Sequence, residues 1–183
     1  MKMKRTLIRP NGVPNSISEQ VVTPIMPSVV YASDSPDALD KQYEGEQNGY
    51  TYAREGHPNA EILALLIDKL EGGTSGLVVS SGMAAISSLI MGTLSSGDHV
   101  LGGSQLYGRT LRLMREDLPR FGIQTSFADP TNIASVKNEI RKNTKMILIE
   151  CVSNPTLRVA DLEGIANLCK KNNILLAVDN TFT

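Results

Sequence analysis

The sequence predicts an α/β protein in which helices cover both faces of a mainly parallel sheet. The chain has 183 residues, 41% of them hydrophobic, which is the length of one domain and enough to bury roughly 70% of the unfolded surface. After Pro58, short apolar runs alternate with segments whose apolar residues recur every three or four positions. This alternation is typical of parallel sheets, because a helix connects each strand to the next.

The first 56 residues are predicted to form an extended arm. Five of the nine prolines fall within the first 36 residues, a stretch without helical or alternating apolar periodicity. A short helix is expected to start at Ser35, with Pro36 at its first position. We therefore expect residues 1–56 to be the arm and residues 57–183 to begin a larger folded domain.

Five helices are predicted after the arm. Asn59 is expected to cap the first, and Gly72 to end it, because glycine readily adopts the left-handed conformation at a helix end. The helix of residues 82–94 is apolar on most sides and is expected to be buried. The other three are a helix that carries Leu111, Met114 and Leu118 and ends at Pro119, a helix capped by Thr131 and a helix capped by Asp161.

Five strands are predicted between these helices, from short apolar runs bounded by turn residues. They comprise residues 76–81, 99–101, 124–128, 145–151 and 174–179. In open sheets of this kind, ligands bind beyond the carboxyl ends of the strands. The residues that follow each strand are therefore the first candidates for a binding site.

Composition excludes several classes of partner. Lys and Arg total 18 and Asp and Glu total 19, a formal net charge of −1, which provides no basic surface for nucleic acid or an anionic membrane. Cys151 and Cys169 each lie inside a predicted regular element, which argues against a disulfide framework and favours a reducing, cytoplasmic location. Residues suited to a metal site are scarce, and neither a membrane span nor a signal peptide is indicated.

A phosphate site is predicted at Ser81, Gly82 and Met83, where the first strand meets its helix. Backbone N–H groups at a helix start carry partial positive charge and bind anions. An ordinary capped turn is the alternative. The sequence lacks both G-x-G-x-x-G and the Walker A pattern, so the two commonest phosphate loops are excluded.

Three further candidates follow later strands. Tyr107 could stack on a flat heterocycle and offer its hydroxyl to a leaving group, or it could pack at a helix start. Asn154 precedes a proline, which favours an extended conformation that presents its amide, although Asn-Pro is also a common turn. Asp179 follows four apolar residues on a strand predicted to be buried, so it needs a partner for its charge; a helix cap or a surface ion pair is the alternative.

One more candidate pair lies outside the sheet, in the segment Tyr50-Thr51-Tyr52-Ala53-Arg54. Residues two apart in an extended segment point the same way, so Tyr52 and Arg54 could bind one anion together. The alternative is a solvated loop.

Together these residues resemble the pyridoxal 5′-phosphate (PLP) enzymes of cysteine and methionine metabolism, a family that includes cystathionine γ-synthase, cystathionine lyases, methionine γ-lyase and O-acetylhomoserine sulfhydrylase. The resemblance spans nearly the whole chain and implies the three-layer aspartate aminotransferase fold (fold type I). It rests on five motifs in family order: Thr51-Tyr52-Ala53-Arg54 with His57-Pro58, Ser80-Ser81-Gly82-Met83-Ala84-Ala85, Tyr107-Gly108, Glu150 with Ser153-Asn154-Pro155-Thr156, and Val178-Asp179-Asn180-Thr181.

The resemblance implies how the cofactor phosphate is held. Ser81, Gly82 and Met83 would bind it within one subunit. Tyr52 and Arg54 would bind the phosphate of the neighbouring subunit, so the enzyme would be a homodimer or homotetramer.

The resemblance also implies roles around the cofactor ring. Tyr107 would stack on the pyridine and assist proton transfer, and Asn154 would approach the ring hydroxyl. Asp179 would keep the pyridine nitrogen protonated, which makes the ring an electron sink. The implied reaction is a β or γ elimination or replacement on a small sulfur-containing or O-acylated amino acid.

Two departures from the family pattern qualify these expectations. The segment of residues 55–59 differs from the asparagine-proline-threonine form usual after the tyrosine and arginine. The family's Schiff-base lysine follows the Asp179 strand by a few dozen residues, beyond Thr183. We therefore expect a truncated large domain that is inactive by itself, and poor solubility, because residues 76–81 would lack neighbouring strands.

Two alternative functions remain open from the sequence. The chain could be a non-catalytic fragment or one half of a split gene that binds a partner. It could also be a nucleotide-binding α/β domain, although it lacks the glycine fingerprint and the acidic residue that follows it.

Overall fold

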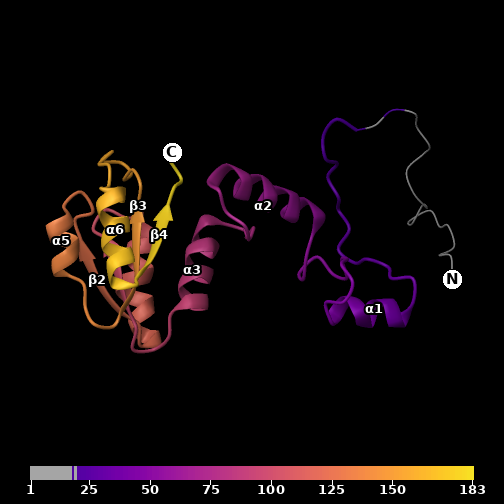
Figure 1. Cartoon of the computed structure of the whole chain (residues 1–183), viewed down its shortest axis with the longest axis horizontal. Helices are drawn as coiled ribbons and strands as arrows, with labels where there is room; N and C mark the ends of the chain where they lie inside the picture. The colour runs from indigo at the N-terminus through magenta and orange to yellow at the C-terminus, as the bar shows by residue number, and fades with distance from the viewer. Residues whose placement is uncertain (1–17, 19) are drawn as a thin grey trace. The chain divides into compact units, whose positions relative to one another are not determined.

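The computed structural model of the chain describes residue 18 and residues 20–183. They divide into two compact units at the boundary between residues 78 and 79, and each unit is described by itself (Figure 1). The predicted arm lies partly outside the described residues, and its boundary after residue 56 stays a prediction.

The described part of the first unit holds two helices. α1 (Pro36–Tyr43) begins as predicted, because the Ser35 hydroxyl accepts the N–H of Ala38 at 3.1 Å. α2 (Pro58–Glu71) ends at Gly72, whose φ of 69° is left-handed. Between residues 20 and 35 the chain forms no helix or strand and makes one isolated bridge, from Val30 to Tyr52.

The prediction that Asn59 caps α2 is wrong. Pro58 takes the first helical position, where its fixed φ and missing N–H are tolerated, so His57 becomes the N-cap. The ring of His57 accepts the N–H of Asn59 at 3.2 Å. The Asn59 amide instead tethers the preceding chain: it accepts the N–H of Met26 and donates to the carbonyl of Pro24, both at 2.8 Å.

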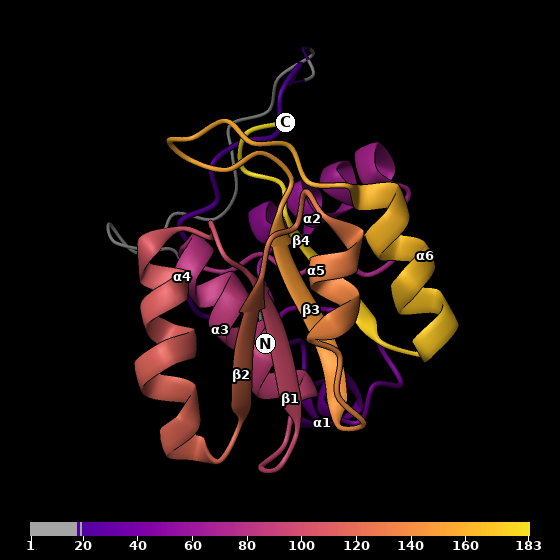
Figure 2. The ribbon, with the colours of Figure 1, turned by 90° about the vertical axis from the view of Figure 1, so that its left-hand side faces the viewer.

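Four parallel strands form the sheet of the second unit, in the order β2-β1-β3-β4. They are β1 (His99–Gly103), β2 (Gln124–Ala128), β3 (Thr144–Glu150) and β4 (Leu175–Asp179). Figure 2 shows helices on both faces of this sheet. One face carries α3 (Gly82–Thr93) and α4 (Gly108–Arg112), and the other carries α5 (Ile133–Asn138) and α6 (Leu162–Asn172). The predicted α/β class is confirmed.

Alternating residues of β3 supply two separate cores. Met146 and Leu148 belong to the core that includes Ile90 of α3, whereas Ile147 and Ile149 belong to the core on the α5–α6 face. All four β3 side chains are at most 2% exposed. Burial on both faces explains why this strand is a continuous apolar run.

The strand predicted over residues 76–81 is absent. None of the four strands pairs with this segment, and an extended segment without a partner lacks the ladder of hydrogen bonds that defines a strand. The N–H of Gly76 donates to the Asp68 carboxylate instead, at 2.8 Å.

The expectation that α3 is buried on most sides is also wrong. Only Ile86 and Ile90 of this helix are buried, and Met91 is 52% exposed. The sheet covers one face of α3 and leaves its other apolar side chains in contact with solvent. Neither α3 nor any other helix in the described part of the chain is long and apolar enough to span a membrane.

Two helix boundaries differ from the prediction and one agrees with it. α4 continues through a π-helical turn (Leu113–Asp117) into a 3₁₀ turn (Leu118–Phe121), because Pro119 enters the first turn of the 3₁₀ segment, where its missing N–H is not needed. α5 is capped by Asn132, not by Thr131. Asp161 caps α6 as predicted and accepts the N–H of Gly164 at 2.9 Å.

Candidate functional site

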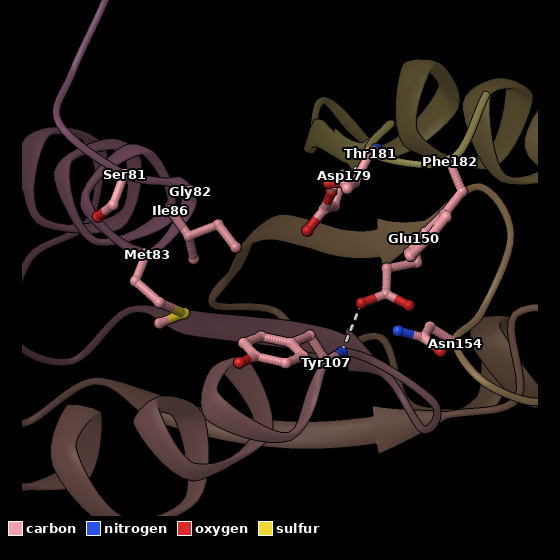
Figure 3. Close-up of a pocket in the computed structure, with 10 residues that line it drawn as sticks. All are labelled: Ser81, Gly82, Met83, Ile86, Tyr107, Glu150, Asn154, Asp179, Thr181 and Phe182. Atoms are coloured by element: carbon pink, nitrogen blue, oxygen red, sulfur yellow. Dashed lines mark hydrogen bonds between the residues drawn. The ribbon is translucent and has the colours of Figure 1, made fainter.

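A cavity of about 390 Å³ lies at the carboxyl ends of β3 and β4 in the second unit (Figure 3). Six residues predicted to bind a cofactor contribute to its wall, although they come from four separate segments of the chain. The lining residues are Ser81, Gly82, Met83, Ile86, Tyr107, Glu150, Asn154, Asp179, Thr181 and Phe182. The part of the chain that the structure describes contains no group of acidic, histidine or cysteine side chains able to hold a metal ion.

The amino end of α3 forms one wall of the cavity. Ser81 caps this helix, and its hydroxyl accepts the N–H of Ala84 at 3.1 Å. A helix leaves its first N–H groups without partners inside the helix, and here they include those of Gly82 and Met83. A Cβ built at Gly82 would meet nothing within 4 Å, so the space beside these N–H groups is open. The capped turn and the anion site are therefore compatible features of one segment.

Tyr107 forms a second wall, at the start of α4. Its ring lies at the cavity (Figure 3) and the residue is 49% exposed. Its N–H donates to Oε1 of Glu150 at 2.5 Å. Figure 3 draws the Met83 side chain beside this ring, and its sulfur accepts a hydrogen bond from the hydroxyl of Thr110 in α4 at 3.7 Å. A half-exposed aromatic ring is available for stacking on a flat ligand.

Asp179 is the last residue of β4 and contributes a carboxylate to the cavity. Its Oδ1 accepts both the N–H of Thr181, at 3.2 Å, and the hydroxyl of the same residue, at 2.5 Å. The expectation of a buried strand is wrong here: β4 is an edge strand among the described residues, and Val178 is 40% exposed. Asp179 is accordingly half-buried and needs no cationic partner from the protein.

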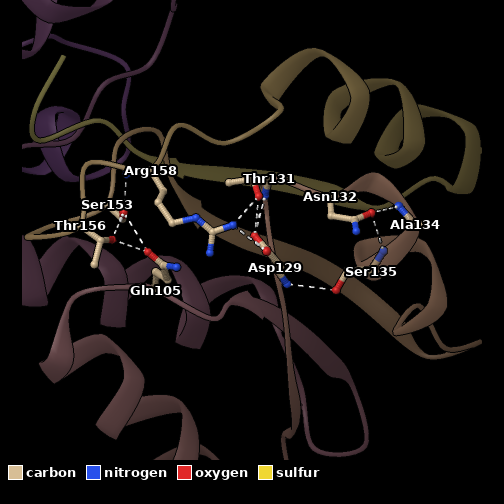
Figure 4. A network of polar contacts seen from close by, with 9 residues as sticks. All are labelled: Gln105, Asp129, Thr131, Asn132, Ala134, Ser135, Ser153, Thr156 and Arg158. Atoms are coloured by element: carbon tan, nitrogen blue, oxygen red, sulfur yellow. Dashed lines mark hydrogen bonds and ion pairs between the residues drawn. The ribbon is translucent and has the colours of Figure 1, made fainter.

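Asn154 lies in the loop that follows β3, which a polar network holds (Figure 4). The hydroxyls of Ser153 and Thr156 lie 2.6 Å apart, and each lies within hydrogen-bonding distance of the side-chain carbonyl of Gln105, so their two protons serve these three contacts. The backbone N–H of Arg158 donates to the Ser153 hydroxyl at 3.0 Å. This network fixes the loop on both sides of Asn154, whose peptide bond to the following proline is cis.

The Arg158 guanidinium extends the network to the loop after β2. Its Nη2 lies 2.7 Å from Oδ2 of Asp129 and donates to the Thr131 hydroxyl at 2.6 Å (Figure 4). The hydrogen bond from the Arg158 guanidinium to the Asp129 carboxylate lowers the pKa of Asp129 below its ordinary value, and the hydrogen bonds from Thr131 to the same carboxylate add to this effect. The loops after three neighbouring strands are thus joined by side chains.

Glu150 is the site residue that the sequence analysis left without a role. It ends β3 and is only 8% exposed, and its Oε2 is buried without a hydrogen-bond partner. Burial raises the pKa of this carboxyl, the N–H groups of Tyr107 and Asn154 oppose that rise, and the charge of Asp179 adds to it. The sequence did contain a signal that could have singled out Glu150 as a site residue: it is an acid at the end of an apolar strand, the same pattern that singled out Asp179.

Tyr52 and Arg54 lie in the first unit, so they are described apart from this cavity. The chain turns after Tyr52, since the N–H of Glu55 donates to its carbonyl at 2.8 Å. The predicted extended segment therefore stops at Tyr52. The two side chains nevertheless lie together, with the Arg54 guanidinium 4.8 Å from the centre of the Tyr52 ring. Arg54 also forms an exposed ion pair with Glu55 at 3.2 Å.

The sequence motifs and this geometry agree with the comparison against known families. The family model described as Cys/Met metabolism PLP-dependent enzyme matches residues 5–183. The chain belongs to this family. The predicted family and its cofactor, PLP, are thereby confirmed.

Two curated relatives that the chain resembles are named as lyases. It is 38% identical over 172 residues to the L-methionine gamma-lyase of Fusobacterium nucleatum, a match that covers 93% of this chain and 44% of the relative. It is 44% identical over 138 residues to the cystathionine gamma-lyase of Bacillus subtilis, covering 75% of this chain and 36% of the relative. The chain thus spans less than half the length of these relatives.

Solved structures of PLP enzymes share the fold. The Campylobacter jejuni protein assigned as an O-acetylhomoserine (thiol)-lyase, whose structure contains N′-pyridoxyl-lysine-5′-monophosphate, matches with a TM-score of 0.82 and 32% identity over 88% of this chain and 40% of its own. Cystathionine gamma-lyase from Lactobacillus plantarum matches with a TM-score of 0.77 and 33% identity over 87% and 39%. The predicted fold type I is confirmed for the part of the fold that this chain contains.

The cavity residues of this PLP-family chain fit the cofactor. PLP presents a phosphate, a flat ring and a ring nitrogen that an acid can hold protonated. The cavity offers a matching group for each part: first-turn N–H groups beside open space for the phosphate, a half-exposed tyrosine for the ring and the carboxylate of Asp179 for the nitrogen. All three line the same cavity.

Proposed function

We propose that the cavity of the second unit is the PLP site, with each group of the cofactor at a different wall. Ser81, Gly82 and Met83 hold the phosphate at the amino end of α3, because first-turn N–H groups bind anions. Tyr107 stacks on the ring, and Asn154 approaches the ring hydroxyl. The observation that carries the proposal is that these segments line one cavity.

Asp179 is proposed to face the pyridine nitrogen. Its carboxylate favours the protonated form of that nitrogen, as an opposite charge does for any cation nearby. Hydrogen bonds from Thr181 to Oδ1 fix the orientation of the carboxylate. Bound PLP supplies an electron sink for the substrate's α carbon, and the Tyr107 hydroxyl is the group we assign to proton transfer at the substrate.

The proposed reaction is a β or γ elimination or replacement on a small sulfur-containing or O-acylated amino acid. The names of the relatives support this class, since they include a methionine lyase, cystathionine lyases and an O-acetylhomoserine (thiol)-lyase. We further propose a homodimer or homotetramer, in which Tyr52 and Arg54 hold the phosphate of a neighbouring subunit. Free thiols at Cys151 and Cys169 suit a reducing compartment, the cytoplasm.

For this chain by itself we propose cofactor binding without catalysis. None of the ten residues that line the cavity is a lysine, so no amine of the lining is available for the covalent attachment that the family uses. Residues 57–183 would then act as the first part of the large PLP-binding domain.

Equilibrium dialysis of the purified protein against PLP tests the cofactor site. We expect saturable binding of PLP, and weaker binding of pyridoxal, which lacks the phosphate. Failure of PLP to bind would overturn the proposed site. For the reaction, the polypeptide tested is a longer one that contains residues 1–183 together with a Schiff-base lysine, because the 183-residue chain alone is expected to give no product. It is incubated with PLP and L-methionine, cystathionine, or O-acetylhomoserine with sulfide, and 2-oxo acid and homocysteine are measured. Absence of product from all three would overturn the proposed reaction class.

A further inference from the structure

Glu150 joins two of the segments that carry the proposed cofactor site. Its Oε1 accepts the backbone N–H of Tyr107 at 2.5 Å, across 43 positions of sequence. The backbone N–H of Asn154 also favours its ionised form. Figure 3 shows the carboxylate between the Tyr107 N–H and the Asn154 side chain.

Stability alone does not explain an acid at this position. Glu150 is 8% exposed and keeps one oxygen, Oε2, buried without a partner, which costs free energy. The register also pairs it with Asp179 on the neighbouring strand, so two carboxylates stand at adjacent strand ends and disfavour each other's charge. A neutral acceptor would bind the Tyr107 N–H without the repulsion from Asp179.

Tyr107 needs an anchor of this kind. It is the N-cap of α4, and no side chain caps that helix. The residue is 49% exposed, so packing does not fix its side chain. A charge-assisted hydrogen bond to the backbone N–H fixes the residue from which the ring projects.

We propose that Glu150 is a positioning residue of the PLP site, which holds the Tyr107 backbone so that the ring lies against the cofactor. The inference rests on the proposed function for its role in binding. The clamp itself is a property of the protein without cofactor, so the two can be tested separately.

The clamp is tested by amide hydrogen exchange in the absence of PLP. Glu150→Ala removes the acceptor and is expected to speed exchange of the Tyr107 amide by at least about 10-fold, since hydrogen bonds to charged groups are strong. Glu150→Gln keeps a neutral acceptor and is expected to speed it by about 3-fold. Glu163→Gln, an exposed acid in α6, serves as the matched control. Unchanged exchange of the Tyr107 amide in both Glu150 variants would overturn the clamp.

The positioning role is tested by a double-mutant cycle with Tyr107→Ala. We expect Glu150→Ala to weaken PLP binding by about 30-fold and Glu150→Gln by about 3-fold, both with a loss of the circular dichroism induced in bound PLP. In the Tyr107→Ala background the same Glu150 changes are expected to matter less than about 2-fold. Equal factors in both backgrounds would mean that Glu150 acts independently of the ring, and the role would be wrong.

The outcomes separate the two proposals. If the unchanged protein binds no PLP, the proposed function fails, and the exchange measurement still decides whether the clamp exists. If PLP binds and the cycle is additive, the function stands and the positioning role fails. Glu150→Gln is the variant that decides if Glu150→Ala does not fold.

Discussion

The two ends of the sheet each bury one titratable side chain, and the two side chains differ in how completely they are hydrogen-bonded. At the amino end, His99 is fully buried and both ring nitrogens have partners: Nδ1 lies 2.8 Å from the Thr144 hydroxyl and Nε2 lies 2.9 Å from the Ser126 hydroxyl. At the carboxyl end, Glu150 has a partner for Oε1 only. Buried polar groups are normally hydrogen-bonded. The arrangement of His99 therefore suits stability, whereas Glu150 keeps one buried oxygen without a partner, at the end of the sheet where the proposed site lies.

The two groups also shift stability in opposite directions with pH. Burial lowers the pKa of His99 to about 4, and the positive charge of Arg141 adds to this while Glu139 opposes it. Burial raises the pKa of Glu150. Since the folded state disfavours the charged form of each, His99 lowers stability as pH falls and Glu150 lowers it as pH rises.

The largest expected effect concerns His99. Its pKa is 6.5 ordinarily and about 4 in the folded protein, so between these values the unfolded chain binds more protons. Stability is fully present above pH 6.5 and is lost as pH falls toward 4, by about 3 kcal/mol in total. Urea unfolding from pH 7.5 to 4.5 measures this loss.

The control for this prediction is His99→Gln, which cannot titrate. Other acids lose their charge over the same range, so the quantity of interest is the difference in slope between the two proteins. The variant is expected to be less stable at pH 7.5 and to lose less with acid. Parallel slopes would show that His99 does not contribute to the pH dependence.

The next largest effect is expected at the carboxyl end, from Asp179→Asn. A neutral amide cannot hold a protonated pyridine nitrogen, so PLP should bind about 100-fold more weakly, about 2.7 kcal/mol. Pyridoxal, which shares the ring, should lose the same factor. Equilibrium dialysis at pH 7.5 measures both. His99→Gln is expected to leave PLP affinity within about 2-fold. Equal losses of PLP affinity in the two variants would contradict the assignment of the cofactor site to the carboxyl end of the sheet.

The sequence predicted which residues meet at the carboxyl-end cavity, and it predicted four of the five strands correctly. Asp179 and Tyr107 were found because they follow apolar runs, and parallel strands bring such residues to one edge. The strand at residues 76–81 was wrongly predicted, because its apolar pattern specifies a strand only when another strand pairs with it. The role of Glu150 was missed, because no local pattern shows that the Tyr107 N–H comes within 2.5 Å of it.

A moderate effect is expected from Ser81→Ala at the phosphate wall. Loss of the cap on α3 should cost about 1 kcal/mol of stability, and PLP affinity should fall about 5-fold while pyridoxal affinity stays the same. Ser35→Ala is a matched control, because Ser35 caps α1 through the same hydrogen bond. It should lose similar helix stability without any change for PLP. A 5-fold loss for pyridoxal as well would place the phosphate elsewhere.

The smallest effect is expected from Arg158→Gln, in the network beside Asn154. The guanidinium contacts Asp129 and Thr131, but its side chain is 42% exposed, and exposed ion pairs contribute little. The loop is also held by Ser153, whose hydroxyl accepts the backbone N–H of Arg158 whatever its side chain. PLP affinity should therefore fall by no more than about 3-fold, while NMR titration should show the pKa of Asp129 rising toward its ordinary value.

Arg120→Gln is the control for this last change, since Arg120 forms an exposed 3.9 Å pair with Asp117 and has no link to the loop after β3. It should alter neither PLP affinity nor the pKa of Asp129. A loss of PLP affinity in Arg158→Gln as large as that in Asp179→Asn would mean that the Asn154 loop depends on its outer ion pair. In that case the hydrogen-bond network between the loops, more than the Glu150 contact at the strand ends, would hold the cofactor site in place.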